Sequence, residues 1–325
     1  MTGLAGLDKP LDQELEQHRS PLTGYCYRML GSAFDAEDAV QETMVRAWRG
    51  ASRFEGRSSV RSWLYTIATN VCLDMLASRK RRALPLDLSS TPSPPVEASL
   101  GAPLPEGTWV EPIPDARVAP DGDPAEVAVA RESVRLAFVA ALQHLPPRQR
   151  AVLVLRDVLR WHAAEVADLL GTTVASVNSA LQRARATLAD RDLADTRPDP
   201  LDEDDQLLLD RYVTAFEAYD MTSLVALLHE DATMSMPPFA LWLQGPDAVA
   251  AWMTGPGAAC EGSRLVPVVV NGAPGYAQYK PGAPGRLEPW SLIVLAVSGG
   301  RIRGITHFLD TRLFALFGLP GHLEA

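Results

Sequence analysis

The feature that most constrains the fold of this chain is a proline-rich break at residues 83–125. This stretch holds ten of the 26 prolines, seven acidic residues and one basic residue. Proline fixes φ and removes a backbone donor, so the composition predicts a stiff, acidic, extended linker rather than a helix or a central strand. A shorter break of proline and acid follows at residues 195–205. The 325 residues therefore divide into three modules, at about 11–82, 126–191 and 206–325.

Charge is distributed unevenly among these modules. The formal net charge of the whole chain is −10, which argues against a nucleic-acid partner because phosphate binding needs clustered Lys and Arg. The first two modules carry +2 and +3, whereas the linker carries −6 and residues 192–325 carry −9. Between Arg46 and Arg82, nine basic residues stand against only Glu55 and Asp74. This asymmetry indicates a nucleic-acid-binding half beside an acidic module, although a solvated basic helix face would explain the charge equally well.

Several classes of protein are disfavoured by composition. No apolar run approaches the roughly 18–20 residues that cross a bilayer, and the first residues lack the pattern of a signal peptide. We therefore expect a cytoplasmic protein without a membrane partner. Cys26, Cys72 and Cys260 are odd in number and show no metal-ligand spacing, so neither a disulfide framework, a metal site nor a cofactor is expected.

The first module predicts an amphipathic helix that starts at Asp35, a suitable N-cap. Its buried stripe is expected to hold Val40, Met44, Ala47 and Trp48. A compact polar flank holds Asp38, Gln41, Glu42 and Val45. On spacing alone, that flank suits a solvated surface better than a docking site.

A longer helix is predicted from about Ser58 to Arg82. Trp63, Thr66 and Asn70 share one face of it, and basic residues flank that face. A stacking aromatic, a base-reading amide and phosphate-holding cations are what binding of single-stranded DNA requires. The alternative from spacing alone is that Trp63 belongs to the core and Asn70 is a surface amide.

These two helices carry a family resemblance. PLTGYCYRMLGSAFDAEDAVQETMVRAWRGASRF, followed by SWLYTIATNVCLDMLASRKRR, resembles region 2 of the extracytoplasmic-function group of sigma-70 family factors. In that family the D-A-V-Q-E helix docks on the clamp helices of the RNA polymerase β′ subunit, which here implies contacts from Asp38, Gln41, Glu42 and Arg46. The W-L-Y-x-I-A-x-N segment of the family captures a flipped base of the −10 element. The residues implied here are Trp63 and Asn70, with Arg57 and Arg61 before them; spacing and charge add Thr66, Arg79, Lys80, Arg81 and Arg82.

The second module predicts a helix-turn-helix. Residues 124–143 suit one helix, and the paired prolines at 146 and 147 suit the first turn of the next. A short helix then ends at Gly171, and Thr173 can cap a second helix whose inward residues are Val174, Val177 and Leu181. The exposed face of that second helix would enter a DNA major groove, the alternative being a plain αα-hairpin.

The exposed positions of this second helix carry DNA-reading chemistry. Asn178 and Gln182 can each bond bidentately to adenine, and Arg183 and Arg185 can hold phosphates or a guanine. L-P-P-R-Q-R, E-V-A-x-L-L-G-T and V-x-S-x-L-x-R-A-R resemble sigma region 4, which reads the −35 element. The contacts implied are Thr173, Ala175, Ser176, Asn178, Ser179, Gln182, Arg183 and Arg185. The long linker departs from that group, in which it is usually short and threads toward the RNA exit channel; an acidic strand there could mimic RNA.

The third module predicts an α+β fold, with helices first and a run of antiparallel strands after them. Its apolar SLIVLAV strand should be central. The order resembles the SnoaL-like cone, which encloses a pocket. The candidate pocket residues are Met234, Met236, Trp242, Trp252, Trp290, His307 and Phe308. Catalysis has thin support, because Asp220 and Asp231 look like loop or strand-start carboxylates and His307 suits a core position equally well.

The whole chain resembles extracytoplasmic-function sigma factors with a fused SnoaL-like domain, the SigG-like subfamily. The resemblance implies two all-α domains followed by an α+β cone, and no catalytic residues. Its implied partners are core RNA polymerase, through the β′ clamp helices and the β flap, promoter DNA, and in some members an anti-sigma factor. The acidic module would modulate the sigma core. Two alternatives remain: a one-component helix-turn-helix regulator with a ligand-binding domain, and a SnoaL-like enzyme tethered to DNA.

Overall fold

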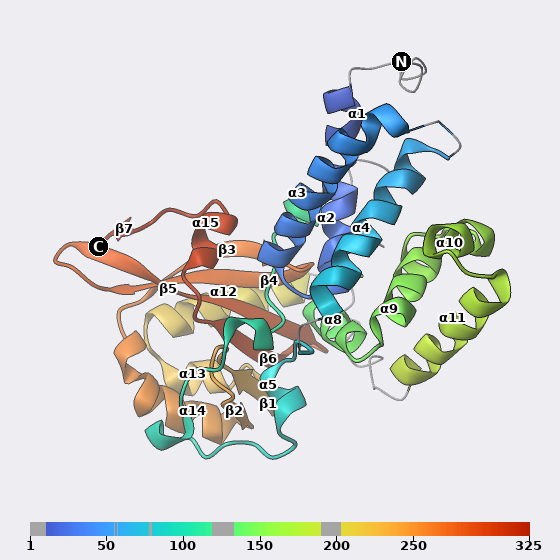
Figure 1. The fold of residues 1–325 in the computed structure, drawn as a ribbon. Coiled ribbons are helices and arrows are strands. Elements are labelled where there is room, and N and C mark those ends of the chain that lie inside the picture. The colour runs from blue at the N-terminus through green and yellow to red at the C-terminus, as the bar shows by residue number, and fades with distance from the viewer. Residues whose placement is uncertain (1–10, 55, 57, 78–79, 119–132, 190–202) are drawn as a thin grey trace. The chain divides into compact units, whose positions relative to one another are not determined.

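The computed structural model describes all residues except 1–10, 55, 57, 78–79, 119–132 and 190–202 (Figure 1). The chain forms two compact units. One comprises Met1–Arg82 with Val110–Leu193, and the other comprises Ala83–Trp109 with Ala194–Ala325. The proline-rich stretch is therefore shared between the units. No helix in the described part of the chain has both the length and the apolar character needed to cross a membrane.

The first half of the helical unit is built on three long helices, α2, α3 and α4, which pack side by side (Figure 1). Its first elements are α1 (Leu11–Glu16), α2 (Arg19–Leu30), α3 (Ala33–Gly50), a 3₁₀ turn (Ala51–Arg53) and α4 (Val60–Ala77). Tyr25 of α2 lies 5.2 Å from Tyr65 of α4 between ring centroids, and its hydroxyl meets that of Thr69 at 2.7 Å. Burying these aromatics with their polar ends bonded fixes α2 against α4.

Two details of α3 differ from expectation. The N-cap is Ser32, whose hydroxyl accepts the Asp35 N–H at 3.1 Å, so the helix starts earlier than predicted. Trp48 is 66% exposed rather than buried. Because it lies seven residues after Gln41, it continues the polar flank, while Val40 and Ala47 form the buried stripe as predicted.

The predicted helix from 58 to 82 is also shorter than expected. α4 ends at Ala77, and Arg81 and Arg82 are not helical. Arg82 is only 7% exposed and pairs with Asp35 at 2.6 Å and with Glu111 at 3.7 Å. The chain that follows α4 is therefore held at Arg82 by an ion-pair cluster.

The second half of the helical unit contains the predicted helix-turn-helix. Its elements are α6 (Asp115–Val118), α8 (Leu136–Gln143), α9 (Pro147–Leu153), a π-helical turn (Val154–Val158), α10 (Ala163–Leu170) and α11 (Val174–Ala189). Gly171 is left-handed at φ 60, and the Thr173 hydroxyl accepts the Ser176 N–H at 3.1 Å. Val177 and Leu181 are buried as expected, whereas Val174 is exposed. The predicted start of the preceding helix, at residues 124–132, lies outside the described residues.

The second unit is α+β. Its helices are α12 (Glu203–Glu217), α13 (Met221–Val225), α14 (Pro246–Thr254), a 3₁₀ turn (Pro256–Cys260) and α15 (Arg312–Leu316). Its strands are β1 (Leu228–Ser235), β2 (Trp242–Gln244), β3 (Arg264–Val270), β4 (Ala273–Pro281), β5 (Arg286–Ser298), β6 (Arg301–Phe308) and β7 (Leu323–Glu324). The order β2-β1-β6-β5-β4-β3 makes β5 an interior strand, as its apolar sequence predicts.

Two features of this sheet were not expected. β1 and β6 pair in parallel, with Met234 opposite Ile305, although an all-antiparallel run was predicted. β4 was not predicted, because its sequence APGYAQYKP contains glycine and two prolines.

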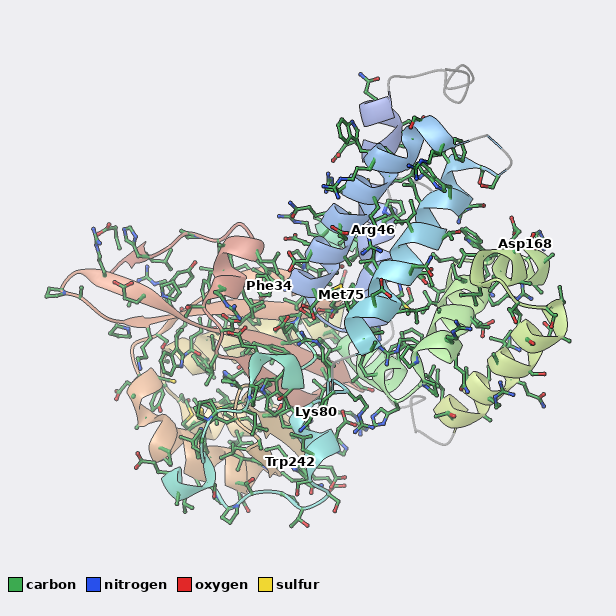
Figure 2. All side chains as sticks on the ribbon, in the orientation of Figure 1. Phe34, Arg46, Met75, Lys80, Asp168 and Trp242 are labelled. Carbon is green, nitrogen blue, oxygen red and sulfur yellow. The ribbon has the colours of Figure 1, made fainter. Side chains whose placement is uncertain are left out.

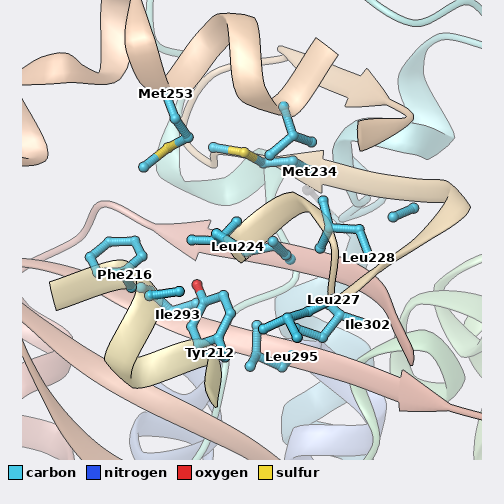
Figure 3. Packing of buried hydrophobic residues seen from close by; sticks show 14 of the residues in the cluster. Tyr212, Phe216, Leu224, Leu227, Leu228, Met234, Met253, Ile293, Leu295 and Ile302 are labelled. Carbon is cyan, nitrogen blue, oxygen red and sulfur yellow. The ribbon is translucent and has the colours of Figure 1, made fainter. Parts of the chain in front are cut away.

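The core of this unit lies between one face of the sheet and helices α12 to α14 (Figure 3). Tyr212 and Phe216 of α12 pack there with Ile293 and Leu295 of β5, and Met253 packs from α14. The rings of Tyr212 and Tyr276 stack at 5.9 Å.

Residues 83–109 form a loop that closes on itself and docks on the α+β unit. Its ends meet where the Ala83 N–H donates to the Thr108 carbonyl at 2.8 Å. This loop contains only short helical turns, α5 (Pro85–Leu88), Glu97–Ser99 and Glu106–Thr108. The loop is folded against the surface of the α+β unit, whereas its composition predicted an extended linker.

Candidate functional site

The predicted docking face of α3 is exposed. Asp38 and Gln41 are exposed, and Glu42 is half-buried. Arg46, labelled in Figure 2, donates to Glu42 at 2.7 Å and lies 3.6 Å from Asp74. These surface ion pairs raise the pKa of Arg46, the bond to Glu42 being the largest cause. All of this leaves a mixed-charge face open to a partner, with the indole of Trp48 at its end.

The predicted face of α4 includes an aromatic pair. Trp63 is half-buried, and its ring lies 4.8 Å from that of Phe54, which precedes the helix. Asn70 is exposed on the same face, while the Thr66 hydroxyl is turned back to the Ser62 carbonyl at 2.9 Å. A Cβ on Gly50 would come within 3.3 Å of the Trp63 ring, so glycine there lets the aromatic pair pack closely.

The predicted basic residues around this face have different environments. Arg61 and Lys80 are exposed (Lys80 in Figure 2), and Arg81 contacts His144. Arg82 is buried in its ion-pair cluster, so the structure does not place it at the exposed face. Arg57 and Arg79 lie outside the described residues.

The predicted recognition face of α11 is wholly exposed. Exposed residues on it are Thr173, Ala175, Ser176, Asn178, Ser179, Gln182, Arg183 and Arg185. Arg185 is already engaged: it donates twice to Asp157, at 2.9 and 2.7 Å. That bidentate pair ties α11 to the end of the π-helical turn. The exposed amides of Asn178 and Gln182 lie at the centre of the face, and no side-chain hydrogen bond ties either of them to the described part of the chain.

The structure brings together only part of the predicted pocket. Met234, Met236 and Trp252 join the core cluster. His307 pairs with Ile293 across β5 and β6, so its side chain is on the same face of the sheet.

Other predicted pocket residues lie elsewhere. Trp242 is on the opposite face, because its strand neighbour Leu243 is the one in the cluster. Phe308 pairs with Leu292, on the opposite face from His307. Trp290 is 37% exposed under the ammonium of Lys280, 3.8 Å from the ring centroid.

A buried polar row crosses the inner face of the sheet. Ser291 donates to Gln278 at 2.7 Å, Gln278 donates to Ser263 at 3.0 Å, and Nδ1 of His307 lies 3.4 Å from the Ser291 hydroxyl. Burial lowers the pKa of the His307 imidazole to about 4. The carboxylates considered for catalysis are not in this row: Asp220 caps α13, and Asp231 is exposed on β1.

Three family models match the chain in order. They are sigma-70 region 2 over residues 15–82, sigma-70 region 4 over 135–188, and a SnoaL-like domain over 209–305. Over 321 residues the chain is 47% identical to the ECF RNA polymerase sigma factor SigG of Mycobacterium tuberculosis, with 95% of this chain and 83% of that protein covered. The chain belongs to the extracytoplasmic-function sigma factors.

A second relative supports the same architecture. The chain is 31% identical over 249 residues to SigJ of Mycobacterium tuberculosis, covering 74% of this chain and 72% of that protein. The crystal structure of SigJ matches with a TM-score of 0.60 at 25% identity, over 95% of this chain and 99% of that chain.

This membership decides between the readings that the sequence left open. A sigma factor binds core RNA polymerase and promoter DNA and directs transcription initiation, and it is not an enzyme. The one-component regulator and the tethered enzyme are therefore wrong for this chain. Sequence reasoning did not single out Phe54, and it placed Trp48 in the buried stripe, although Trp48 is exposed. Phe54 could have been found as the last aromatic before the W-L-Y segment, nine residues ahead of Trp63, and the exposure of Trp48 by its seven-residue spacing from Gln41.

The buried imidazole gives a pH prediction for the SnoaL-like domain of this sigma factor. The folded-state pKa of His307 is about 4, below the ordinary 6.5, so the stabilising contribution is complete above pH 6.5 and is lost as pH falls toward 4. The loss should reach about 3 kcal/mol. Thermal unfolding between pH 7.5 and 4.5 should show a steeper fall for the wild type than for His307→Gln. Parallel curves would contradict the assignment.

Proposed function

We propose that the sigma factor uses separate surfaces of its modules for core polymerase and for the two elements of the promoter. The module at 11–82 would bind core polymerase through α3 and the −10 element through α4. The module at 126–191 would bind the −35 element through α11 and would also contact the β flap of core polymerase. The module at 206–325 would modulate both. That an anti-sigma factor binds this chain is an expectation that rests on the family resemblance.

The proposed polymerase contact rests on the exposed flank of α3. Its centre is Gln41 and Glu42, with Asp38 before them and Trp48 after them. An exposed tryptophan beside a few polar groups is the composition of an interface hot spot. We propose that this flank docks on the β′ clamp helices.

Charge reversal on this flank tests the polymerase contact. Gln41→Lys combined with Glu42→Lys should abolish co-purification with core polymerase, and Trp48→Ala should weaken it by at least tenfold, about 1.4 kcal/mol. Asp204→Lys, an exposed charge reversal on α12, is the matched control. Normal polymerase binding by the double variant would refute the contact.

The proposed −10 contact rests on the aromatic pair and the amide of α4. Trp63 and Phe54 offer a platform for an unstacked base, Asn70 can bond its edge, and Arg61 and Lys80 can hold phosphates. Phe54 is an addition from the structure.

The proposed −35 contact rests on the exposed face of α11. Asn178 and Gln182 lie one turn apart, which suits two adjacent base edges, and Arg183 projects beside them. Because Arg185 is held by Asp157, we assign it to positioning α11 as well as to phosphate binding.

Two substitutions on α11 separate base reading from phosphate binding. Asn178→Ala should cost roughly 1–3 kcal/mol at one base pair of the −35 element and relax the preference there. Arg183→Ala should weaken binding on every promoter and reduce the slope of binding against salt by about 1. Binding of holoenzyme to promoter variants by fluorescence anisotropy measures both. Equal losses on all sequences for Asn178→Ala would refute base reading.

The proposed modulatory role rests on the docked loop at 83–109. Trp242 of β2 donates its indole N–H to the Ser89 carbonyl at 3.1 Å, and its own carbonyl accepts the Ser93 N–H at 2.8 Å. Farther along the loop, the Leu104 N–H donates to the Pro238 carbonyl at 2.9 Å, and Glu106 pairs with Arg312 at 3.2 Å. The SnoaL-like domain thereby holds the chain that connects region 2 to region 4. We propose that this docking limits how far the two regions can separate.

Weakening the loop contacts tests this role. Trp242→Phe with Arg312→Ala should raise in vitro transcription from the full chain severalfold, toward the level of a chain that ends at residue 191. The reason is that both substitutions remove bonds that hold the loop while leaving regions 2 and 4 unchanged. Trp290→Phe, on the face of Lys280, is the control. Output equal to wild type in both the double variant and the truncated chain would refute the role.

A further inference from the structure

The part of the linker that follows the docked loop is built into the fold of region 2. It runs from Val110 to Val118 and ends in α6. The Tyr27 hydroxyl of α2 donates to the Glu111 carbonyl at 2.7 Å, and the Glu111 N–H donates to the Gly31 carbonyl at 2.9 Å. We call residues 110–118 the return segment.

The far end of the return segment is anchored on α2. Val118 is 4% exposed, and its carbonyl oxygen lies 3.4 Å from the position that a Cβ on Gly24 would take, so the glycine lets α6 approach α2 closely. The Ser20 hydroxyl donates to the Arg117 carbonyl at 3.3 Å. Because these contacts fix the backbone of α6, they also fix where the Arg117 side chain leaves it.

The Arg117 side chain lies beside the first turns of α3. Its Nη1 is 3.2 Å from Oε1 of Glu37, and the side chain is 53% exposed. Within the described residues this Glu37 oxygen is buried and accepts no hydrogen bond, so its contact with Arg117 is one of charge. A guanidinium has five N–H donors, and a half-exposed one in such a contact keeps donors for a second partner.

Glu37 begins an exposed stripe on α3. One face of the helix carries, at helical spacing, Glu37, Gln41, Met44 and Trp48. Gln41 and Trp48 are exposed, and Met44 is half-buried. Arg117 therefore lies at one end of the stripe, and Trp48 lies at the other. Arginine, methionine and tryptophan are residue types that are enriched at protein interfaces.

Arg117 adds a positive charge where α3 has none of its own. Residues 33–41 hold three carboxylates and no basic residue. Arg19 of α2 also lies near Glu37, but it is bonded to Glu16 at 2.7 Å. A charge at the rim of an interface raises the rate of encounter and orients the partner. The position of Arg117 suits such a role at the start of the α3 stripe.

We propose that Arg117 is part of the surface that docks on core polymerase, where it pairs with a carboxylate of the polymerase. The docking surface is then composite, because α3 comes from region 2 and the cation comes from the linker. This inference rests on the proposed contact of α3 with polymerase and extends its edge. It gives the return segment a role in polymerase binding, which is separate from the docking of residues 83–109 on the SnoaL-like domain.

Substitutions at Arg117 test the contact through the affinity of the full-length chain for core polymerase. Arg117→Glu should weaken binding at least fivefold at low salt and less at high salt, because rim charges are screened. Arg211→Glu makes the same charge change at an exposed arginine of α12 and should bind as the wild type does. Equal affinities of Arg117→Glu and the wild type would overturn the proposal.

A double-mutant cycle separates a direct contact from a role through Glu37. If Arg117 meets the polymerase itself, Arg117→Ala should lower affinity by the same factor in the wild type and in a Glu37→Gln background. A loss confined to the wild-type background would overturn the contact. Should Arg117→Glu unfold at a lower temperature than the wild type, Arg117→Ala carries the test, because it places no like charge beside Glu37.

Proximity is tested by cross-linking in the assembled holoenzyme. A benzophenone maleimide on Ala116→Cys, an exposed position next to Arg117, in a Cys260→Ser background should cross-link to the β′ subunit. The same label on a chain that also carries Gln41→Lys and Glu42→Lys is the control for random collision. Absence of the cross-link from a transcribing complex overturns the proposal.

The outcomes distinguish this contact from the proposed function. Normal polymerase binding by the Gln41→Lys, Glu42→Lys chain refutes the docking of α3 and the contact of Arg117 with it. Normal binding by Arg117→Glu, beside a double variant that does not bind, refutes the contact of Arg117 alone.

Discussion

The buried guanidinium of Arg82 is the interaction on which the arrangement of the helical unit depends. It pairs with Asp35 in the first turn of α3 and with Glu111, which follows the loop at 83–109 where the chain re-enters the helical unit. Glu111 also accepts the hydroxyl of Ser32, the N-cap of α3. One cation therefore fixes the end of region 2, the start of α3 and the return of the linker. Removing one partner of such a cluster leaves buried charge uncompensated, which is strongly destabilising.

Much of this fold could be predicted from the chain's periodicity and turn chemistry. The stripe of Val40 and Ala47, the left-handed Gly171 and the apolar run of β5 each follow from local rules. The places where prediction was wrong involve contacts distant in sequence. In the sequence Arg82 is one member of a basic run. Its burial depends on the pair with Glu111, which is distant in sequence. The spacing of Trp48 fits two neighbouring faces of α3, and packing alone chooses between them.

Negative charge in the linker has local roles that its composition did not indicate. Asp87 accepts the Leu84 N–H at 2.9 Å, Glu106 pairs with Arg312, and Glu111 pairs with Arg82. Acidic side chains used in this way position the loop. An acidic strand that mimics RNA would require this loop to leave the surface of the α+β unit and release the pair of Glu106 with Arg312. Part of the net charge of −10 therefore comes from linker carboxylates that hold the linker in place.

The closed loop also has a consequence for the order in which the chain is made. Ser89 and Trp242, which bond each other, are 153 residues apart in sequence. At about 5–20 residues per second of synthesis, the loop leaves the ribosome roughly 8 to 30 seconds before the strand that receives it. Region 2 is complete throughout that interval, and region 4, which ends near residue 188, is complete for about its last third, yet their connection is still unrestrained. Each new molecule therefore passes through a brief period in which its sigma core exists without its own C-terminal domain.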